Sequence, residues 1–157
     1  MILNGRLIYL AEPGGYIQWM EADIENCNLV QHVSQASCES LTDLSSSALA
    51  YLRSKGNDPS RCQQLPELFT TLGLEHCTQD IFSSDRDPDL RAEFTDIFAR
   101  TLLGIMENAG LEMWNGWDCE KVRELERKVF WELETEVAYM RCDFRIVVGR
   151  VPDTVRK

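Results

Sequence analysis

The stretch that decides the fold is a turn leading directly into a strand: Ala11-Glu12-Pro13-Gly14-Gly15-Tyr16-Ile17-Gln18-Trp19-Met20. Proline followed by two glycines is a strong turn signal, because proline fixes one backbone angle and glycine adopts conformations that other residues avoid. The residues after the turn are mostly types that favour strands. Two acidic residues, Glu21 and Asp23, follow the strand. We therefore expect a strand at 16–20 with carboxylates at its exit.

The rest of the chain predicts helices alternating with strands. We expect a helical region at 28–54, a short helix at 64–72, a strand at 74–82, a helix from 88 or 89 to 109, a helix to about 136 with Asp118 as its cap, and a final strand at 139–151. Three strands among four or five helices predict one α/β domain, residues 1–157, with a small mixed sheet. The run Ile146-Val147-Val148 is typical of a strand buried on both faces.

Composition excludes several classes of partner. The formal net charge is -10, from 26 acidic and 16 basic residues, whereas nucleic acids and anionic membranes attract clustered lysine and arginine. The start of the sequence lacks the pattern of a signal peptide, and no apolar run approaches the roughly 20 residues that span a bilayer. The six cysteines are scattered without a Cys-x-x-Cys pair. We therefore expect reduced thiols in a cytoplasmic protein, without a metal site.

The opening turn also carries a family resemblance. From Leu10 to Asp23 the sequence resembles class I S-adenosylmethionine-dependent methyltransferases, in which a Pro-Gly-Gly turn opens the fifth strand of a seven-stranded sheet. The version here, Gly-Gly-Tyr-Ile-Gln-Trp with acidic residues after it, is similar to methyltransferases of fungal secondary-metabolite pathways, and the order of later elements agrees. The resemblance implies the C-terminal half of a Rossmann-like methyltransferase fold acting in small-molecule biosynthesis.

The same resemblance implies S-adenosyl-L-methionine as the cofactor. In such families a glycine-rich loop after the first strand lets the backbone approach the cofactor. This chain has no Gly-x-Gly pattern, and its one Gly-Gly belongs to the later turn. We therefore expect the family's first four strands to be missing, no cofactor-binding residue to carry over, and a truncated protein that cannot bind S-adenosylmethionine alone.

Three residues near the first strand are candidates for catalysis. Glu21 and Asp23 could act as a general base or orient a substrate's hydroxyl or amine, if partial burial raises the carboxyl pKa. His32 could exchange protons near neutral pH. The alternative is two solvated acids and a packed histidine.

Three tryptophans are candidates for contact with a small-molecule substrate. Trp19 lies in the first strand, and Trp114 and Trp117 flank a turn where they could line an aromatic pocket or anchor two helices. Because ligands of open α/β sheets bind beyond the carboxyl ends of parallel strands, we expect a pocket near Trp19, with the helical region 28–55 forming part of its cover.

Three functions remain open from the sequence. The protein could be a methyltransferase-family enzyme acting on a small metabolite, with a partner chain supplying what it lacks. It could be a cofactor-independent cyclase or isomerase, because positioning alone can catalyse such steps. It could also be a pseudoenzyme or interaction subunit, in which a partner chain or a second copy completes the short sheet.

Overall fold

A computed structural model describes residues 11–31, 38–88, 91–135 and 138–153 and shows an α/β protein. The strands are β1 (Tyr16–Ala22), β2 (Asn28–Gln31), β3 (Glu75–Ser83), β4 (Ala138–Arg141) and β5 (Asp143–Arg150). The α-helices are α1 (Glu39–Ser54), α2 (Leu65–Thr71), α3 (Arg91–Leu111) and α4 (Cys119–Glu134). Short 3₁₀ helices are η2 (Ile24–Asn26), η3 (Pro59–Gln64) and η4 (Trp114–Gly116). Among the described residues, no helix combines the length and the apolar character needed to cross a bilayer.

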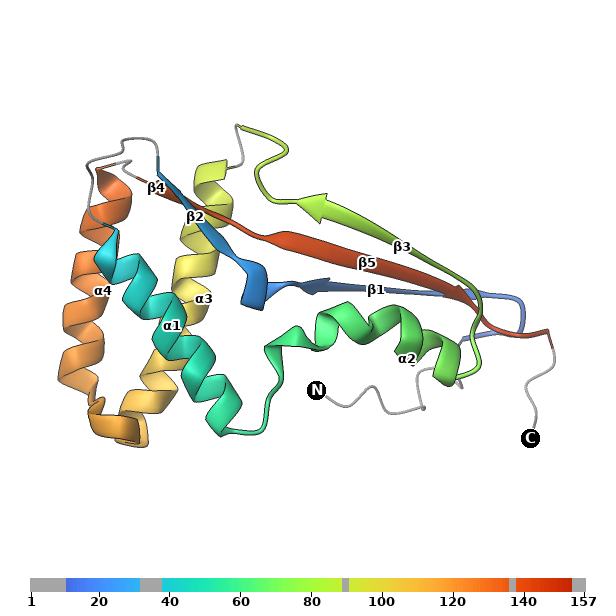
Figure 1. Cartoon of the computed structure of the whole chain (residues 1–157), viewed down its shortest axis with the longest axis horizontal. Helices are drawn as coiled ribbons and strands as arrows, with labels where there is room; N and C mark the ends of the chain where they lie inside the picture. The colour runs from blue at the N-terminus through green and yellow to red at the C-terminus, as the bar shows by residue number, and fades with distance from the viewer. Residues whose placement is uncertain (1–10, 32–37, 89–90, 136–137, 154–157) are drawn as a thin grey trace.

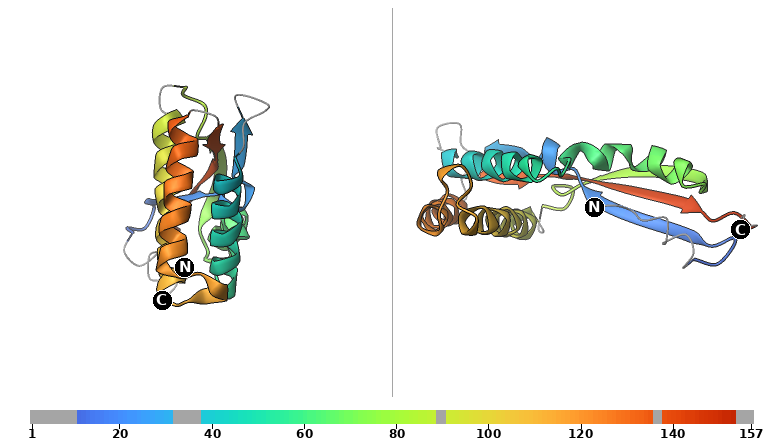
Figure 2. Two further views of the ribbon diagram at one scale, coloured as in Figure 1. Left: turned by 90° about the vertical axis from the view of Figure 1, so that its left-hand side faces the viewer. Right: turned by 90° about the horizontal axis from the view of Figure 1, so that it is seen from below.

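The molecule is elongated, with a helical end and a sheet end (Figure 1). Helices α1, α3 and α4 gather at one end with the β2–β4 ribbon, and Figure 2 shows them side by side. The sheet end consists of β1, β5 and β3 with α2 against it. Each end has its own buried apolar cluster: Leu41, Leu44, Leu102, Met106 and Val129 in the first, and Leu65, Phe69, Leu74, Val147 and Val151 in the second.

Helices α1 and α4 form where the apolar spacing predicts them. In α1, the residues at positions 41, 44, 48 and 51 are buried, which places them on one face of a 3.6-residue helix. In α4, Asp118 accepts a hydrogen bond from the Lys121 backbone N–H at 2.8 Å, as expected for a helix cap. These buried faces pack α1 and α4 against α3.

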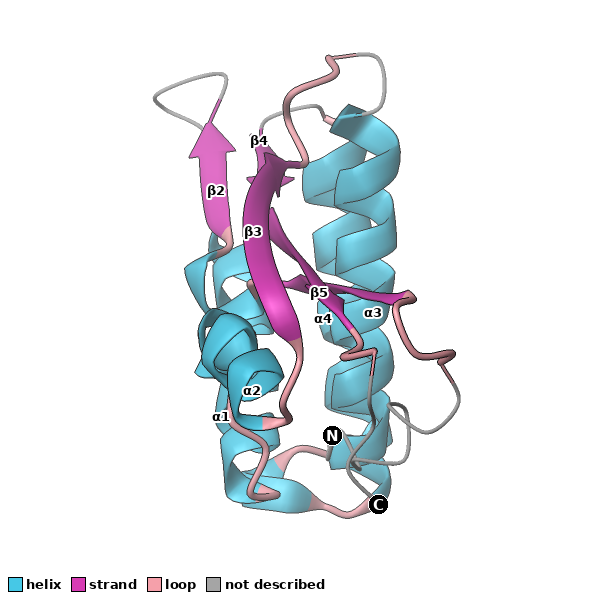
Figure 3. Ribbon diagram, turned by 90° about the vertical axis from the view of Figure 1, so that its right-hand side faces the viewer, coloured by secondary structure: helices cyan, strands magenta, loops and turns pink. Residues whose placement is uncertain are grey.

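The larger sheet places β5 between β1 and β3, antiparallel to both (Figure 1). Figure 3 shows β3 and β5 from the sheet end of the molecule. The opening turn fixes this arrangement, because Gly14 N–H donates to the Val151 carbonyl at 3.0 Å and Val151 N–H donates to the Gly15 carbonyl at 2.8 Å. Gly14 has a φ of +80°, a conformation that favours glycine. The predicted turn therefore joins the start of β1 to the end of β5.

The structure corrects three details of the sequence prediction. The sheet pairs are antiparallel and not mixed. The start of the expected helical region, residues 28–31, forms β2, because Leu29 and Val30 pair with β4. The final strand is broken at Cys142, whose N–H donates to Ser84 Oγ at 2.9 Å instead of to a neighbouring strand. At each of these places, pairing with residues distant in the sequence decides the structure and overrides the preference that the local apolar spacing indicates.

Helix α2 covers one face of the larger sheet (Figure 2). The packing is close: a Cβ at Gly149 would lie 2.9 Å from the Phe69 ring and 3.0 Å from Leu74.

On the opposite face of the larger sheet Tyr16 and Met20 are exposed, so within the described residues β5 is covered on one face and not on both. β1 and β3 are the edge strands of this sheet. Completion of the sheet by a partner chain or a second copy stays a prediction.

Candidate functional site

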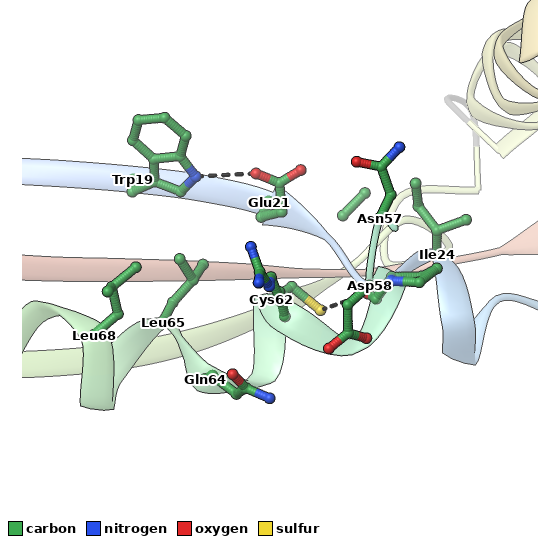
Figure 4. Close-up of a pocket in the computed structure, with 12 residues that line it drawn as sticks. Trp19, Glu21, Ile24, Asn57, Asp58, Cys62, Gln64, Leu65 and Leu68 are labelled. Carbon is green, nitrogen blue, oxygen red and sulfur yellow. Dashed lines mark hydrogen bonds between the residues drawn. The ribbon is translucent and has the colours of Figure 1, made fainter. Parts of the chain in front are cut away.

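A pocket of about 480 Å³ lies between the end of β1 and the η3–α2 segment (Figure 4). Its volume is within the range of roughly 300–1,000 Å³ that is common for small-molecule sites. One wall comes from the first strand and the residues after it, and the other from the turn, η3 and α2; the lining is Trp19, Glu21, Ala22, Ile24, Asn57, Asp58, Pro59, Arg61, Cys62, Gln64, Leu65 and Leu68. The pocket therefore contains two of the residues predicted from sequence, Trp19 and Glu21.

Trp19 and Glu21 form a hydrogen-bonded pair on the strand wall. They are alternate residues of β1, so their side chains leave the same face of the sheet. The indole Nε1–H of Trp19 donates to Glu21 Oε2 at 3.0 Å (Figure 4). No hydrogen bond to the other oxygen, Oε1, comes from the part of the chain that the structure describes. The pair presents an oriented carboxylate beside an aromatic ring.

Asp23 lies behind the pocket wall, with a side chain that is only 2% exposed. Its Oδ2 accepts a hydrogen bond from Arg145 Nε at 3.0 Å and lies 3.0 Å from Nη2 in the same ion pair, and its Oδ1 accepts from Asn26 Nδ2 at 3.0 Å. Burial by itself raises the pKa of the Asp23 carboxyl, but the hydrogen bonds from Asn26 and Arg145 and the charge of Arg145 outweigh it, so the pKa lies below its usual range. Asp23 is therefore ionised at neutral pH and holds Arg145 in place.

Cys62 forms part of the pocket wall facing β1 and is 3% exposed. Burial, followed by the negative charge of Asp23, raises the pKa of the thiol to about 11. The thiol therefore stays protonated at neutral pH and lacks the thiolate form that a nucleophile requires. Cys62 contributes a neutral surface to the pocket.

The helix wall of the pocket is apolar in its depth and polar at its mouth. Leu65 is buried and Leu68 half-buried, facing the strand wall. Asp58 caps η3 at the mouth by accepting from Ser60 N–H at 3.0 Å and Ser60 Oγ at 2.6 Å. The hydrogen bonds from Ser60 lower the pKa of Asp58, so it carries a negative charge at neutral pH. A planar apolar molecule with one polar end matches this lining.

The structure does not bring Trp114 and Trp117 to this pocket. Both are half-buried against the core of the helical end, and Trp114 meets the Tyr51 ring edge-on at a centroid distance of 5.5 Å. They begin and follow η4, which connects α3 to α4 (Figure 1). Their alternative role as helix anchors agrees with these contacts. His32 lies outside the described residues.

The expected cover of the pocket was misplaced in the sequence prediction. Residues 57–68 form the second wall, whereas the prediction gave that place to 28–55. Sequence reasoning also missed Cys62 and Arg145. The sequence does contain a signal for Arg145, because a charged side chain within the apolar run of β5 is expected to pair with an opposite charge. Cys62 gave no comparable signal.

The left-handed glycines of the described residues are not gathered in one loop. The glycines with left-handed backbone lie in four separate turns: Gly14, Gly56, Gly73 and Gly116. Gly15 lies within the turn, where a Cβ would be 2.9 Å from the Glu12 carbonyl oxygen. That the chain cannot bind S-adenosylmethionine alone stays a prediction. Comparison with known proteins adds no family, because no protein-family model and no curated protein matches the sequence.

Proposed function

We propose that this protein is a methyltransferase-family protein of small-molecule biosynthesis, acting in the cytoplasm, whose pocket holds the acceptor molecule and not the methyl donor. The observation that carries the proposal is the Trp19–Glu21 pair in a pocket of about 480 Å³. The resemblance implies a substrate at this end of β1. Six free thiols agree with a reducing compartment.

Glu21 would orient the acceptor group. Its Oε2 is held by the Trp19 indole, which leaves Oε1 to accept a hydrogen bond from a hydroxyl or amine on the ligand. Methyl transfer to oxygen or nitrogen requires a fixed acceptor atom and a group that can take its proton. Trp19, Leu65 and Leu68 would bury the apolar body of the ligand.

We assign none of the described residues to the methyl donor and derive no step through it. Methyl transfer would need donor-binding residues from another segment or another chain. The Trp19–Glu21 pocket also suits a second candidate, a cofactor-independent cyclase or isomerase on a methyltransferase-derived scaffold. Such an enzyme would need only the pocket, because orientation of a reactive molecule can itself accelerate a reaction.

Filling the pocket tests whether it binds small molecules. We expect 2-phenylethanol to shift the NMR signal of the Trp19 indole N–H, assigned with Trp19→Phe. Leu68→Trp places a larger ring in the space between the walls, so its Kd for 2-phenylethanol should rise roughly tenfold or more, a loss of about 1.4 kcal/mol. The control is Leu111→Trp, because Leu111 is 73% exposed and outside the pocket. Equal binding by both variants, or no shift in the unmodified protein, contradicts the proposal.

A further inference from the structure

We infer that the pocket selects a cationic amine on a planar apolar body over a neutral alcohol or a carboxylate of the same shape. The inference rests on the proposed function, because it specifies what the Trp19–Glu21 pocket binds. Three features of the described residues lead to it: the carboxylate of Glu21 is not neutralised, a second carboxylate lies on the opposite wall, and the surrounding field is negative.

The first feature is that Arg145 pairs with Asp23 and not with Glu21. Glu21 and Arg145 are directly opposite each other in the β1–β5 register, so an ion pair between them would be expected. The guanidinium instead turns to Asp23, with Nε and Nη2 each 3.0 Å from Oδ2. In the described parts of the chain, Glu21 takes part in no ion pair. Asp23 thus holds Arg145 away and leaves the Glu21 carboxylate available to a ligand.

The second feature is the charge of the lining. Glu21 lies on the strand wall and Asp58 on the helix wall, whereas Arg61, which is exposed, is the one cation among the lining residues. Asp58 is exposed and its Oδ1 accepts hydrogen bonds from Ser60, so Glu21 is the acid that lies beside the apolar part of the lining. With two acids and one cation, the lining favours an ammonium group over a ligand carboxylate.

The third feature is the field at Cys62. After burial, the charges of Asp23 and Glu21 raise the thiol pKa and the charge of Arg145 lowers it, and the result is a pKa of about 11. Among these charges, Asp23 raises the pKa more than Arg145 lowers it and Glu21 adds to the rise, so their net field at the sulfur disfavours a negative charge. The same field favours a positive charge on a ligand at this wall.

Two contacts would then favour an amine: a hydrogen bond to Glu21 and attraction to the Trp19 ring. An ammonium N–H donating to Glu21 Oε1 forms a charge-assisted hydrogen bond between opposite charges. An alcohol O–H can also donate to the carboxylate, but the alcohol carries no charge and gains no Coulomb attraction. The indole of Trp19 adds attraction, because tryptophan is the aromatic side chain that interacts best with cations.

Three probes of one shape test this inference: 2-phenylethylamine, 2-phenylethanol and phenylacetate, each titrated while the Trp19 indole signal is followed. We expect the amine to bind about five- to tenfold more tightly than the alcohol, and phenylacetate to bind most weakly. The advantage of the amine should shrink as salt is raised. Glu21→Gln should remove this advantage, so that the amine and the alcohol bind with similar Kd values. Glu12→Gln, an exposed acid before the turn, should keep it.

The outcomes separate the inference from the proposed function. Equal binding of all three probes, or tighter binding of phenylacetate, overturns amine selection and leaves the pocket as a small-molecule site. Binding of none of them overturns both. An amine preference that persists in Glu21→Gln also overturns the inference, because another group would then recognise the amine. Circular dichroism of each variant confirms that it is folded.

Discussion

Asp23→Asn is expected to lower the free energy of unfolding by about 3 kcal/mol at pH 7, because it leaves the Arg145 charge without its buried partner. The Arg145 side chain is 21% exposed, so water can still hydrate part of its charge. The expected loss therefore lies at the lower end of the range for breaking a buried ion pair. Urea denaturation followed by circular dichroism measures the change. Adding Arg145→Met should restore part of the stability, because the double variant buries no unpaired charge.

The stability gap between Asp23→Asn and the unmodified protein should depend on pH. The folded pKa of Asp23 is lower than the unfolded value of about 4, so its stabilisation is complete above pH 4 and is lost as the pH falls through the folded pKa. Other carboxylates with lowered pKa titrate in both proteins and cancel in the comparison: Asp58, Asp85, Glu112 and Glu124. A gap that stays constant from pH 7 to pH 3, or that is below about 1 kcal/mol at pH 7, contradicts the buried pair.

Glu132→Gln is expected to destabilise the helical end by about 2 kcal/mol. Glu132 of α4 is 4% exposed, and its Oε1 and Oε2 accept from the backbone N–H groups of Ser40 and Leu41 at 2.9 and 3.0 Å. These donors begin α1, whose N-cap residue Cys38 makes no side-chain capping bond. A carboxylate from another helix therefore satisfies the start of α1, where negative charge is also favoured by the helix dipole.

The matched control for Glu132→Gln is Glu134→Gln, two residues further along α4. Glu134 is exposed, so its loss should change the free energy of unfolding by less than about 0.5 kcal/mol. The two variants are compared by urea denaturation at pH 7. Equal midpoints for Glu132→Gln and Glu134→Gln would show that the link from α4 to α1 carries no stability.

Local signals in the sequence predicted most of the elements. The turn at Pro13-Gly14-Gly15 set the start of β1, and apolar periodicity located α1, α3 and α4. Glu21 and Trp19 were identified as site candidates because they lie at the exit of the first strand, and both line the pocket. These features depend on residues close together in the chain, which a single sequence displays directly.

The features that sequence reasoning missed depend on distant residues. The break at Cys142 follows from its bond to Ser84, which is 58 positions away. Asp23 was expected to be a candidate base, and its charge is held by Arg145, 122 positions later. The second wall of the pocket comes from residues 57–68, which carry ordinary turn and helix signals. No local pattern specifies such pairings.

Isothermal titration calorimetry with S-adenosylmethionine and then 2-phenylethylamine, on one preparation of the protein, tests the central claim most directly. The account predicts no measurable heat of binding for S-adenosylmethionine, because the sequence contains no Gly-x-Gly pattern and the pocket is assigned to the acceptor. It predicts saturable binding of 2-phenylethylamine that Leu68→Trp weakens about tenfold or more. Micromolar binding of S-adenosylmethionine, or amine binding that is unchanged in Leu68→Trp, would contradict a pocket that holds the acceptor and not the donor.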